Sequence, residues 1–196
     1  MTGWHLVLDG RCPSKRNMAR DTALFRSLAE KRHNGILRIY NWSEPAVTVG
    51  HHQKNFTPSD PLLTLPVLRR PTGGGAVLHV DDITFCICTP SSGPFSGGIL
   101  AACGTVSKIF ERALRDCGLD VRMKGNHTAF SNVCFMRSTP VELHLGESKI
   151  MGLALLRRNG CILVQGVIPL RIDRKLSVRV FGERSDPRTR GIIDHA

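Results

Sequence analysis

Two arginines and three glycines lie close together between residues 69 and 79, in the sequence Arg-Arg-Pro-Thr-Gly-Gly-Gly-Ala-Val-Leu-His. Glycine loses more conformational freedom on folding than other residues, so three in a row indicate a backbone that must approach something closely. The neighbouring guanidinium groups suggest a partner with negative charge or carbonyl oxygens. A plainer alternative is a tight hairpin turn with solvated arginines, and these residues alone favour neither interpretation.

The elements that must position this loop can be read from apolar spacing. Helical spacing predicts amphipathic helices over residues 17–31 and 99–117, the second capped by Gly118. Strand patterns occur at residues 4–10, 36–42, 46–50, 76–90, 141–145, 149–156 and 161–168. The last three lie close together, which suggests a meander. Because helices and strands do not alternate regularly, we expect an α+β fold with a mixed, mostly antiparallel sheet packed against helices.

Composition narrows the classes of function. The 196 residues, 41% of them hydrophobic, suit a single domain over residues 1–196. No long apolar run and no signal-peptide pattern is present, so we expect a cytoplasmic protein that does not associate with a membrane. The sequence has seven cysteines and no Cys-x-x-Cys pair, which favours reduced thiols over a disulfide framework. The formal charge of +11 is scattered and little interleaved with aromatic residues, which argues against nucleic-acid binding.

Four segments together resemble one enzyme superfamily, that of the biotin and lipoate ligases and octanoyltransferases. They are the glycine loop, the first predicted strand with Asn17–Asp21, the segment Ile39–Gln53, and the segment Ser148–Ile168. The resemblance covers residues 4–170 and leaves a basic C-terminal tail over 171–196. It implies one catalytic domain of the biotin/lipoate protein ligase type.

Within the superfamily the sequence is most similar to the cysteine-dependent LipM-type octanoyltransferases. The segment Asn132–Phe135 resembles their Val-Cys-Phe segment, and Cys134 lies fifteen residues before Lys149, as in that family. Glu142-Leu143 also stands at the matching place. The ligases carry an Asn-Asp pair before this lysine, and the sequence contains none. The resemblance therefore implies a transferase of protein lipoylation, with Cys134 and Lys149 as its catalytic residues.

The chemistry fits these two residue types. An acylated cysteine is itself a thioester, so a thiol can hold the acyl group in activated form between donor and acceptor. A nearby ammonium favours the thiolate, and Lys149 can also polarise the acyl carbonyl with help from N–H groups of the glycine loop. Transfer between thioesters and an amine needs no ATP. We therefore expect no cofactor and no metal, with ATP and Mg²⁺ required only by a ligase.

The remaining expectations concern binding. The residues expected to hold the acyl group are Arg70, Thr72, Gly73, Gly74, Gly75, Ala76, His79, Gly152 and Ala154. His79 could equally be a satisfied core residue. We interpret six cysteines as structural, because this residue type is usually buried; they are Cys12, Cys86, Cys88, Cys103, Cys117 and Cys161.

Two departures from the family pattern stand out. Gln165 replaces a histidine, and Leu153 replaces a small residue where it could narrow the pocket or change the acyl group that fits. The implied partners are an acidic acyl carrier protein and a lipoyl-domain protein such as the glycine cleavage H protein. The positive charge would attract both. Two alternatives stay open: an ATP-dependent lipoate–protein ligase acting through lipoyl-AMP, and a non-catalytic paralogue that binds carriers.

Overall fold

The computed structural model describes residues 3–30, 34–124, 141–182 and 190–195. Cys134 and its neighbours therefore lie outside the described residues. The strands are β1 Trp4–Cys12, β2 Gly35–Trp42, β3 Ala46–Val49, β4 Val67–Arg69, β5 Val77–His79, β6 Asp81–Pro90, β7 Val121–Met123, β8 Leu143–Leu145, β9 Ser148–Lys149, β10 Gly152–Arg158 and β11 Cys161–Arg171. The helices are α1 Ser14–Ala29, α2 Ile99–Asp116 and α3 Arg174–Phe181, with 3₁₀ turns η1 Gly93–Phe95 and η4 Ile192–His195.

A five-stranded sheet in the order β1-β2-β6-β11-β10 forms the centre of the molecule. Only the β1–β2 pair is parallel; the other three pairs are antiparallel. The strands β6 and β11 are buried on both faces, which explains their continuous apolar sequences. On β6, Phe85 and Ile87 join the core on one face while Cys86 and Cys88 join the core on the other. The predicted α+β class is confirmed.

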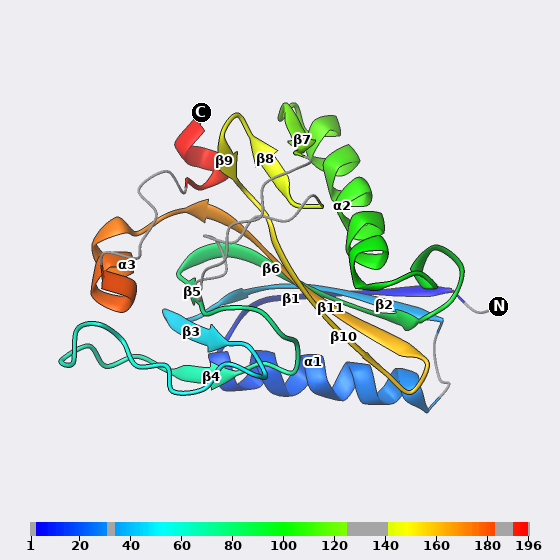
Figure 1. Ribbon diagram of the computed structural model, residues 1–196, viewed down its shortest axis with the longest axis horizontal. Helices are drawn as coiled ribbons and strands as arrows, with labels where there is room; N and C mark the ends of the chain where they lie inside the picture. Colours follow the sequence, from blue (N-terminus) through cyan, green and yellow to red (C-terminus); the bar gives the residue numbers. More distant parts are fainter. Residues whose placement is uncertain (1–2, 31–33, 125–140, 183–189, 196) are drawn as a thin grey trace.

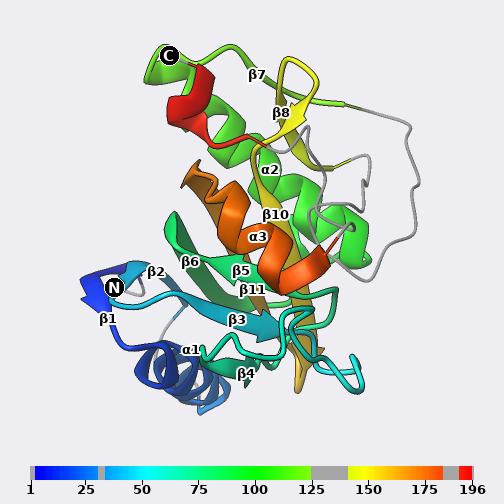
Figure 2. The same ribbon diagram turned by 90° about the vertical axis from the view of Figure 1, so that its left-hand side faces the viewer.

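Each face of this sheet is covered by one of the two long helices, as Figure 1 and Figure 2 show. Helix α1 buries Met18, Phe25 and Leu28, whose spacing of three to seven residues places them on one side. Helix α2 buries Ala102 and Val106 against the opposite face. It ends near Gly118, whose φ of 89° is the left-handed conformation expected after a helix.

Two small sheets flank the central one. The predicted meander is wrong, because its strands belong to two different sheets. Strands β4-β3-β5 form one sheet, and the glycine loop connects β4 to β5. Strands β7-β8-β9 form the other. The segment predicted as one strand over 149–156 is broken at Ile150 and Met151, so Lys149 ends β9 while Gly152 begins β10. Both residues of the break are fully buried, because they turn inward to the core beneath α2.

The segment expected to be a basic tail contains helix α3. Asp173 caps its start by accepting a hydrogen bond from the backbone N–H of Leu176 at 2.9 Å. Val180 is fully buried and joins Val47 and Ala76 in a core cluster beside the β4-β3-β5 sheet. Across the described residues, no helix has the length and apolar character needed to cross a membrane.

Candidate functional site

Both arginines of the glycine loop donate to carbonyl oxygens of the protein itself. Arg70 is 5% exposed, and its guanidinium donates to the carbonyls of Thr48 at 3.1 Å, Gly73 at 2.5 Å and Gly75 at 2.8 Å. Arg69 donates to three carbonyls between residues 50 and 53, at 2.7 to 3.0 Å. These carbonyls belong to the protein itself, so the predicted binding of an outside partner stays a prediction. Two of the Arg70 bonds go to the glycine loop and fix its shape.

The loop packs too closely for larger residues at two glycines. Gly74 has a φ of 90°, and a Cβ there would lie 2.8 Å from the Arg70 guanidinium. A Cβ on Gly50, just after β3, would collide with the carbonyl of Gly74. Because C=O and the next N–H point in opposite directions across a trans peptide, the N–H groups of Gly74 and Ala76 point away from Arg70. The loop thus turns its carbonyls inward and these two donors away from them.

A narrow cavity of about 30 Å³ lies beside this loop, between β5 and the β10–β11 hairpin. Four of the predicted site residues line it, namely Arg70, His79, Gly152 and Ala154. Its apolar lining includes Trp42, Val77, Leu153 and Val167. That volume suits a few water-sized groups and is smaller than an eight-carbon chain. Thr72, the three loop glycines, Ala76 and Lys149 lie outside this lining.

His79 is a bonded core residue. Its Nδ1 lies 3.0 Å from Asp82 Oδ2, and its Nε2 lies 3.0 Å from the Thr48 hydroxyl. Its ring stacks on Trp42 with centroids 4.1 Å apart. Since both ring nitrogens have protein partners outside the glycine loop, His79 forms part of the cavity wall.

Gln165, the residue that departs from the family pattern, connects the glycine loop to α1. The Thr72 hydroxyl donates to Gln165 Oε1 at 2.7 Å, and Gln165 Nε2 donates to Asp21 Oδ2 at 2.7 Å. Asp21 also accepts from Arg38 at 2.6 Å and from the Tyr40 hydroxyl at 2.8 Å. Burial raises the pKa of the Asp21 carboxyl, and the Arg38 guanidinium is the main influence that opposes this shift.

Sequence reasoning missed the Asp21–Arg38 pair, although a signal was present. Asp21 lies on the same side of α1 as Met18 and Phe25, and Arg38 lies on the same face of β2 as buried Ile36. A charged residue at an apolar position of a helix, with an opposite charge at an inward position of the next strand, predicts a buried ion pair. Both side chains are fully buried.

Lys149 is buried at the end of β9 rather than exposed at a sheet edge. It is 7% exposed, and its ammonium donates to Glu142 Oε1 at 2.7 Å. A lysine is rarely buried without an acidic partner, and Glu142 is likewise 5% exposed. Nearby, burial and then the Glu142 charge raise the pKa of the Cys103 thiol to about 11. The site therefore places a cation, a carboxylate and a neutral thiol close together.

The described cysteines are free thiols, and Cys117 is the exposed one among them. Cys86 and Cys88 lie on one face of β6 with their sulfurs 3.6 Å apart. In the described part of the chain, no group of three or more His, Cys, Asp or Glu side chains is placed to hold a metal ion. The predicted nucleophile Cys134 lies outside the described residues.

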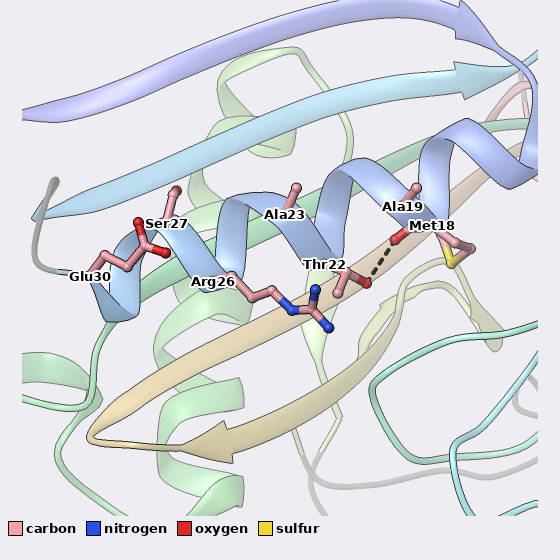
Figure 3. Close-up of a pocket in the computed structure, with 7 residues that line it drawn as sticks. All are labelled: Met18, Ala19, Thr22, Ala23, Arg26, Ser27 and Glu30. Carbon is pink, nitrogen blue, oxygen red and sulfur yellow. Dashed lines mark hydrogen bonds between the residues drawn. The ribbon is translucent and has the colours of Figure 1, made fainter.

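A larger hollow of about 620 Å³ runs along α1 and is shown in Figure 3. Its lining consists of Met18, Ala19, Thr22, Ala23, Arg26, Ser27 and Glu30. Met18 also lines the narrow cavity, so it stands between the two spaces. No predicted site residue lines this hollow, whereas four of them line the narrow cavity.

The fold and the glycine loop together define a catalytic domain of the lipoate ligase and transferase class, and comparison with known proteins agrees. The model of the lipoyl protein ligase A/B catalytic domain matches residues 13–194. The chain belongs to this family, as the sequence resemblance predicted.

Curated relatives and solved structures add detail. An octanoyltransferase LipM from Exiguobacterium sp. (strain ATCC BAA-1283 / AT1b) is 30% identical, over 97% of this chain and 76% of that protein. The LipM of Carboxydothermus hydrogenoformans is also 30% identical, over 94% of this chain and 71% of that protein. A lipoate-protein ligase A structure bound with ATP superposes with a TM-score of 0.77 at 25% identity, covering 99% of this chain and 77% of that one. The predicted class, an acyltransferase enzyme of protein lipoylation, is confirmed.

Proposed function

We propose that this protein moves an octanoyl or lipoyl group from a carrier-protein thioester, through a thioester on Cys134, to a lysine of a lipoyl-domain protein. The observation that most supports this proposal is the buried Lys149 ammonium, which donates to Glu142. It occurs in a chain that is 30% identical to a LipM octanoyltransferase. A buried cation beside a reaction centre has little competition from water, so its field acts strongly on nearby groups.

The proposed reaction has two balanced steps. The Cys134 thiolate attacks the carbonyl carbon of the donor thioester, the new carbon–sulfur bond replaces the old one, and the carrier leaves as a thiolate that takes up a proton. The acceptor lysine amine then attacks the Cys134 thioester, an amide bond forms, and the proton lost by the amine returns to the released cysteine. Both steps need a cation for the thiolate and donors for the carbonyl oxygen.

The described residues supply groups for both needs. The Lys149 ammonium has three N–H donors, and one of them donates to Glu142. In this proposal the Gly74 N–H, which points away from Arg70, donates to the acyl oxygen of the bound substrate. Gly152 and Ala154 have no side chain or a small one, so they take up little space in the cavity wall beside the loop. In this proposal Arg70 and Thr72 bind the substrate indirectly, by fixing Gly73, Gly74 and Gly75.

The other thiols are poor candidates for the acyl carrier. Cys103 lies near Glu142, but with its pKa raised to about 11 it is almost wholly protonated at neutral pH. Burial, the hydrogen bond with Cys88 and the nearby Asp21 charge also raise the pKa of Cys86. Cys117 is exposed beyond the end of α2. Free thiols and a thiol-dependent reaction both suit a reducing compartment, and we place the protein in the cytoplasm.

The partners follow from charge and chemistry. The formal charge of +11 would speed association with acidic carriers, which include an acyl carrier protein as donor and a lipoyl-domain protein such as the glycine cleavage H protein as acceptor. Added salt should therefore lower the rate constant of association more than the rate of transfer within the complex.

Mass spectrometry of the intact protein tests the proposal. Incubation with octanoyl–acyl carrier protein should add one octanoyl group that hydroxylamine removes. Cys134→Ala should abolish this adduct and transfer to the acceptor. Cys117→Ala, which removes an exposed thiol, is the matched control and should retain both.

Two outcomes would overturn it. Modification of the acceptor from free acid, only with ATP and with pyrophosphate release, would establish the ligase alternative. Tight binding of an acyl carrier without adduct or turnover would establish a non-catalytic carrier-binding protein.

A further inference from the structure

The side-chain amide of Gln165 is bonded at both ends to groups from distant parts of the chain. Its Oε1 accepts from the Thr72 hydroxyl and its Nε2 donates to Asp21, each at 2.7 Å. Thr72 is fully buried and Gln165 is 7% exposed. Thr72 directly precedes the three loop glycines, and its own carbonyl accepts from the His51 N–H at 2.8 Å. A change at Gln165 therefore acts on the start of the glycine loop.

The far end of this connection is a rigid anchor. Asp21 is fully buried, accepts from Arg38 at 2.6 Å and from Tyr40 at 2.8 Å, and is held on α1. Arg38 is fixed in turn by Asp9 at 2.6 Å and by the Asn17 side chain at 2.7 Å. Each partner is bonded to elements of the central sheet or to α1, so the anchor has little freedom to move.

We propose that Gln165 is a positioning residue that fixes the catalytic shape of the glycine loop by joining Thr72 to the buried Asp21–Arg38 pair. This inference rests on the proposed function only in its activity readout. The amide suits the position because it offers an acceptor to a hydroxyl and a donor to a carboxylate at once. It also does not titrate, so the amide itself adds no pH dependence to the connection.

The substitution Gln165→Glu turns this property into a test. When protonated, the introduced carboxyl has the shape of the amide and can likewise donate to Asp21 and accept from Thr72. When ionised, it has no donor for Asp21 and places a second negative charge beside it. Burial and the Asp21 charge both raise its pKa above the usual value near 4.3. The neutral, functional form is therefore lost as pH rises.

Several charged or titratable groups surround this position and must be considered in the pH profile. They are Asp9 from β1, Asp21 from α1, Arg38 and Tyr40 from β2, Cys86 opposite Gln165 on β6, His79 from β5, and Arg70. All are present in the wild type and in the variant. The ratio of the two activities at each pH therefore reports the titration that the substitution adds, which belongs to the introduced carboxyl and Asp21 as a pair.

The experiment measures octanoyl transfer by wild type, Gln165→Glu and Gln165→Met between about pH 5.5 and about pH 8.5. Relative to wild type, kcat of Gln165→Glu should fall about 10- to 100-fold from the acidic to the alkaline end, with KM for the carrier little changed. Gln165→Met should be low with a ratio independent of pH. A flat ratio for Gln165→Glu, or wild-type activity in Gln165→Met, would overturn the proposal.

Variants of the hydroxyl partner test the other end. Thr72→Ser keeps the donor and should retain activity within about threefold, while the isosteric Thr72→Val should lose as much as Gln165→Met. Because both break the same connection, their combination should be no worse than either alone. Additive losses would instead indicate two unrelated structural defects.

Hydrogen exchange separates this proposal from the proposed function. Amides of residues 73–76 should exchange faster in Gln165→Met at all pH values, and faster in Gln165→Glu only at alkaline pH, after correction for intrinsic rates. If the wild type transfers no acyl group but these patterns appear, the connection stands and the proposed function fails. If transfer is normal and loop exchange is unaffected, the connection fails alone.

Discussion

Arg70 and Lys149 are both buried cations beside the predicted site, but their surroundings differ. Arg70 distributes its guanidinium over three neutral carbonyls, two of them in the glycine loop. Lys149 instead faces a carboxylate, Glu142, at a break between two strands. A rigid planar fork suits the shaping of a backbone, whereas an ammonium on a flexible stem suits action on a reacting group. From this contrast we propose that Arg70 shapes the loop and that Lys149 acts on the reacting groups.

The substitution Lys149→Met should have the largest effect, and it tests whether Lys149 acts in the reaction. If the ammonium stabilises the transition state, kcat for octanoyl transfer should fall about 1,000-fold. The variant also removes the ammonium that balances the charge of buried Glu142, so the free energy of unfolding should drop by about 3 kcal/mol. Adding Glu142→Gln should restore most of the stability in urea unfolding but none of the activity. Recovery of activity in the double variant would make the pair merely structural.

Arg70→Met compared with Arg69→Met tests the structural role. Both remove a guanidinium that binds three carbonyls, but Arg70 is buried and Arg69 is exposed. Unpaired buried carbonyls are costly, so Arg70→Met should lower the free energy of unfolding by about 2 to 4 kcal/mol. Arg69→Met should cost about 1 kcal/mol or less, because water replaces the lost bonds. Equal effects in urea titration would contradict the assignment.

Leu153→Ala should change acyl-chain preference with a smaller effect. Leu153 lines the narrow cavity, and its truncation opens room for additional methylene groups. We expect the ratio of kcat/KM for ten-carbon over eight-carbon carriers to rise about 10-fold. Leu155→Ala, two residues along the same strand face and outside the cavity lining, is the control. A similar rise in the control would point to general loosening.

Substitution of Cys103 should have the smallest effect on acyl transfer. With a pKa of about 11, about one thiol in a thousand is ionised at pH 8, so iodoacetamide should spare Cys103 and modify exposed Cys117. Because the folded-state pKa lies above the unfolded value of 9.0, the stability that this thiol contributes is lost as pH rises from about 9 to about 11. Peptide mapping and Cys103→Ala, expected to transfer within about twofold of wild type, check this.

Local patterns predicted much of the fold. The helices over 17–31 and 99–117 correspond to α1 and α2, since their apolar spacing is helical whatever they pack against. The apolar pattern predicts one unbroken strand over 149–156, because nothing in the local sequence shows that Ile150 and Met151 turn into the core. Membership of Lys149 and Gly152 in different sheets is a tertiary result.

For the site, the sequence alone identified the glycine loop, its arginines, Lys149 and the departure at Gln165, because residue types and their spacing are visible without a fold. It could not show that Arg70 binds the loop's own carbonyls, or that Gln165 spans from Thr72 to Asp21 on α1. These partners lie 93 and 144 residues from Gln165. Burial decides the role of a polar group by removing water as its alternative partner, and only the tertiary structure determines which groups are buried together.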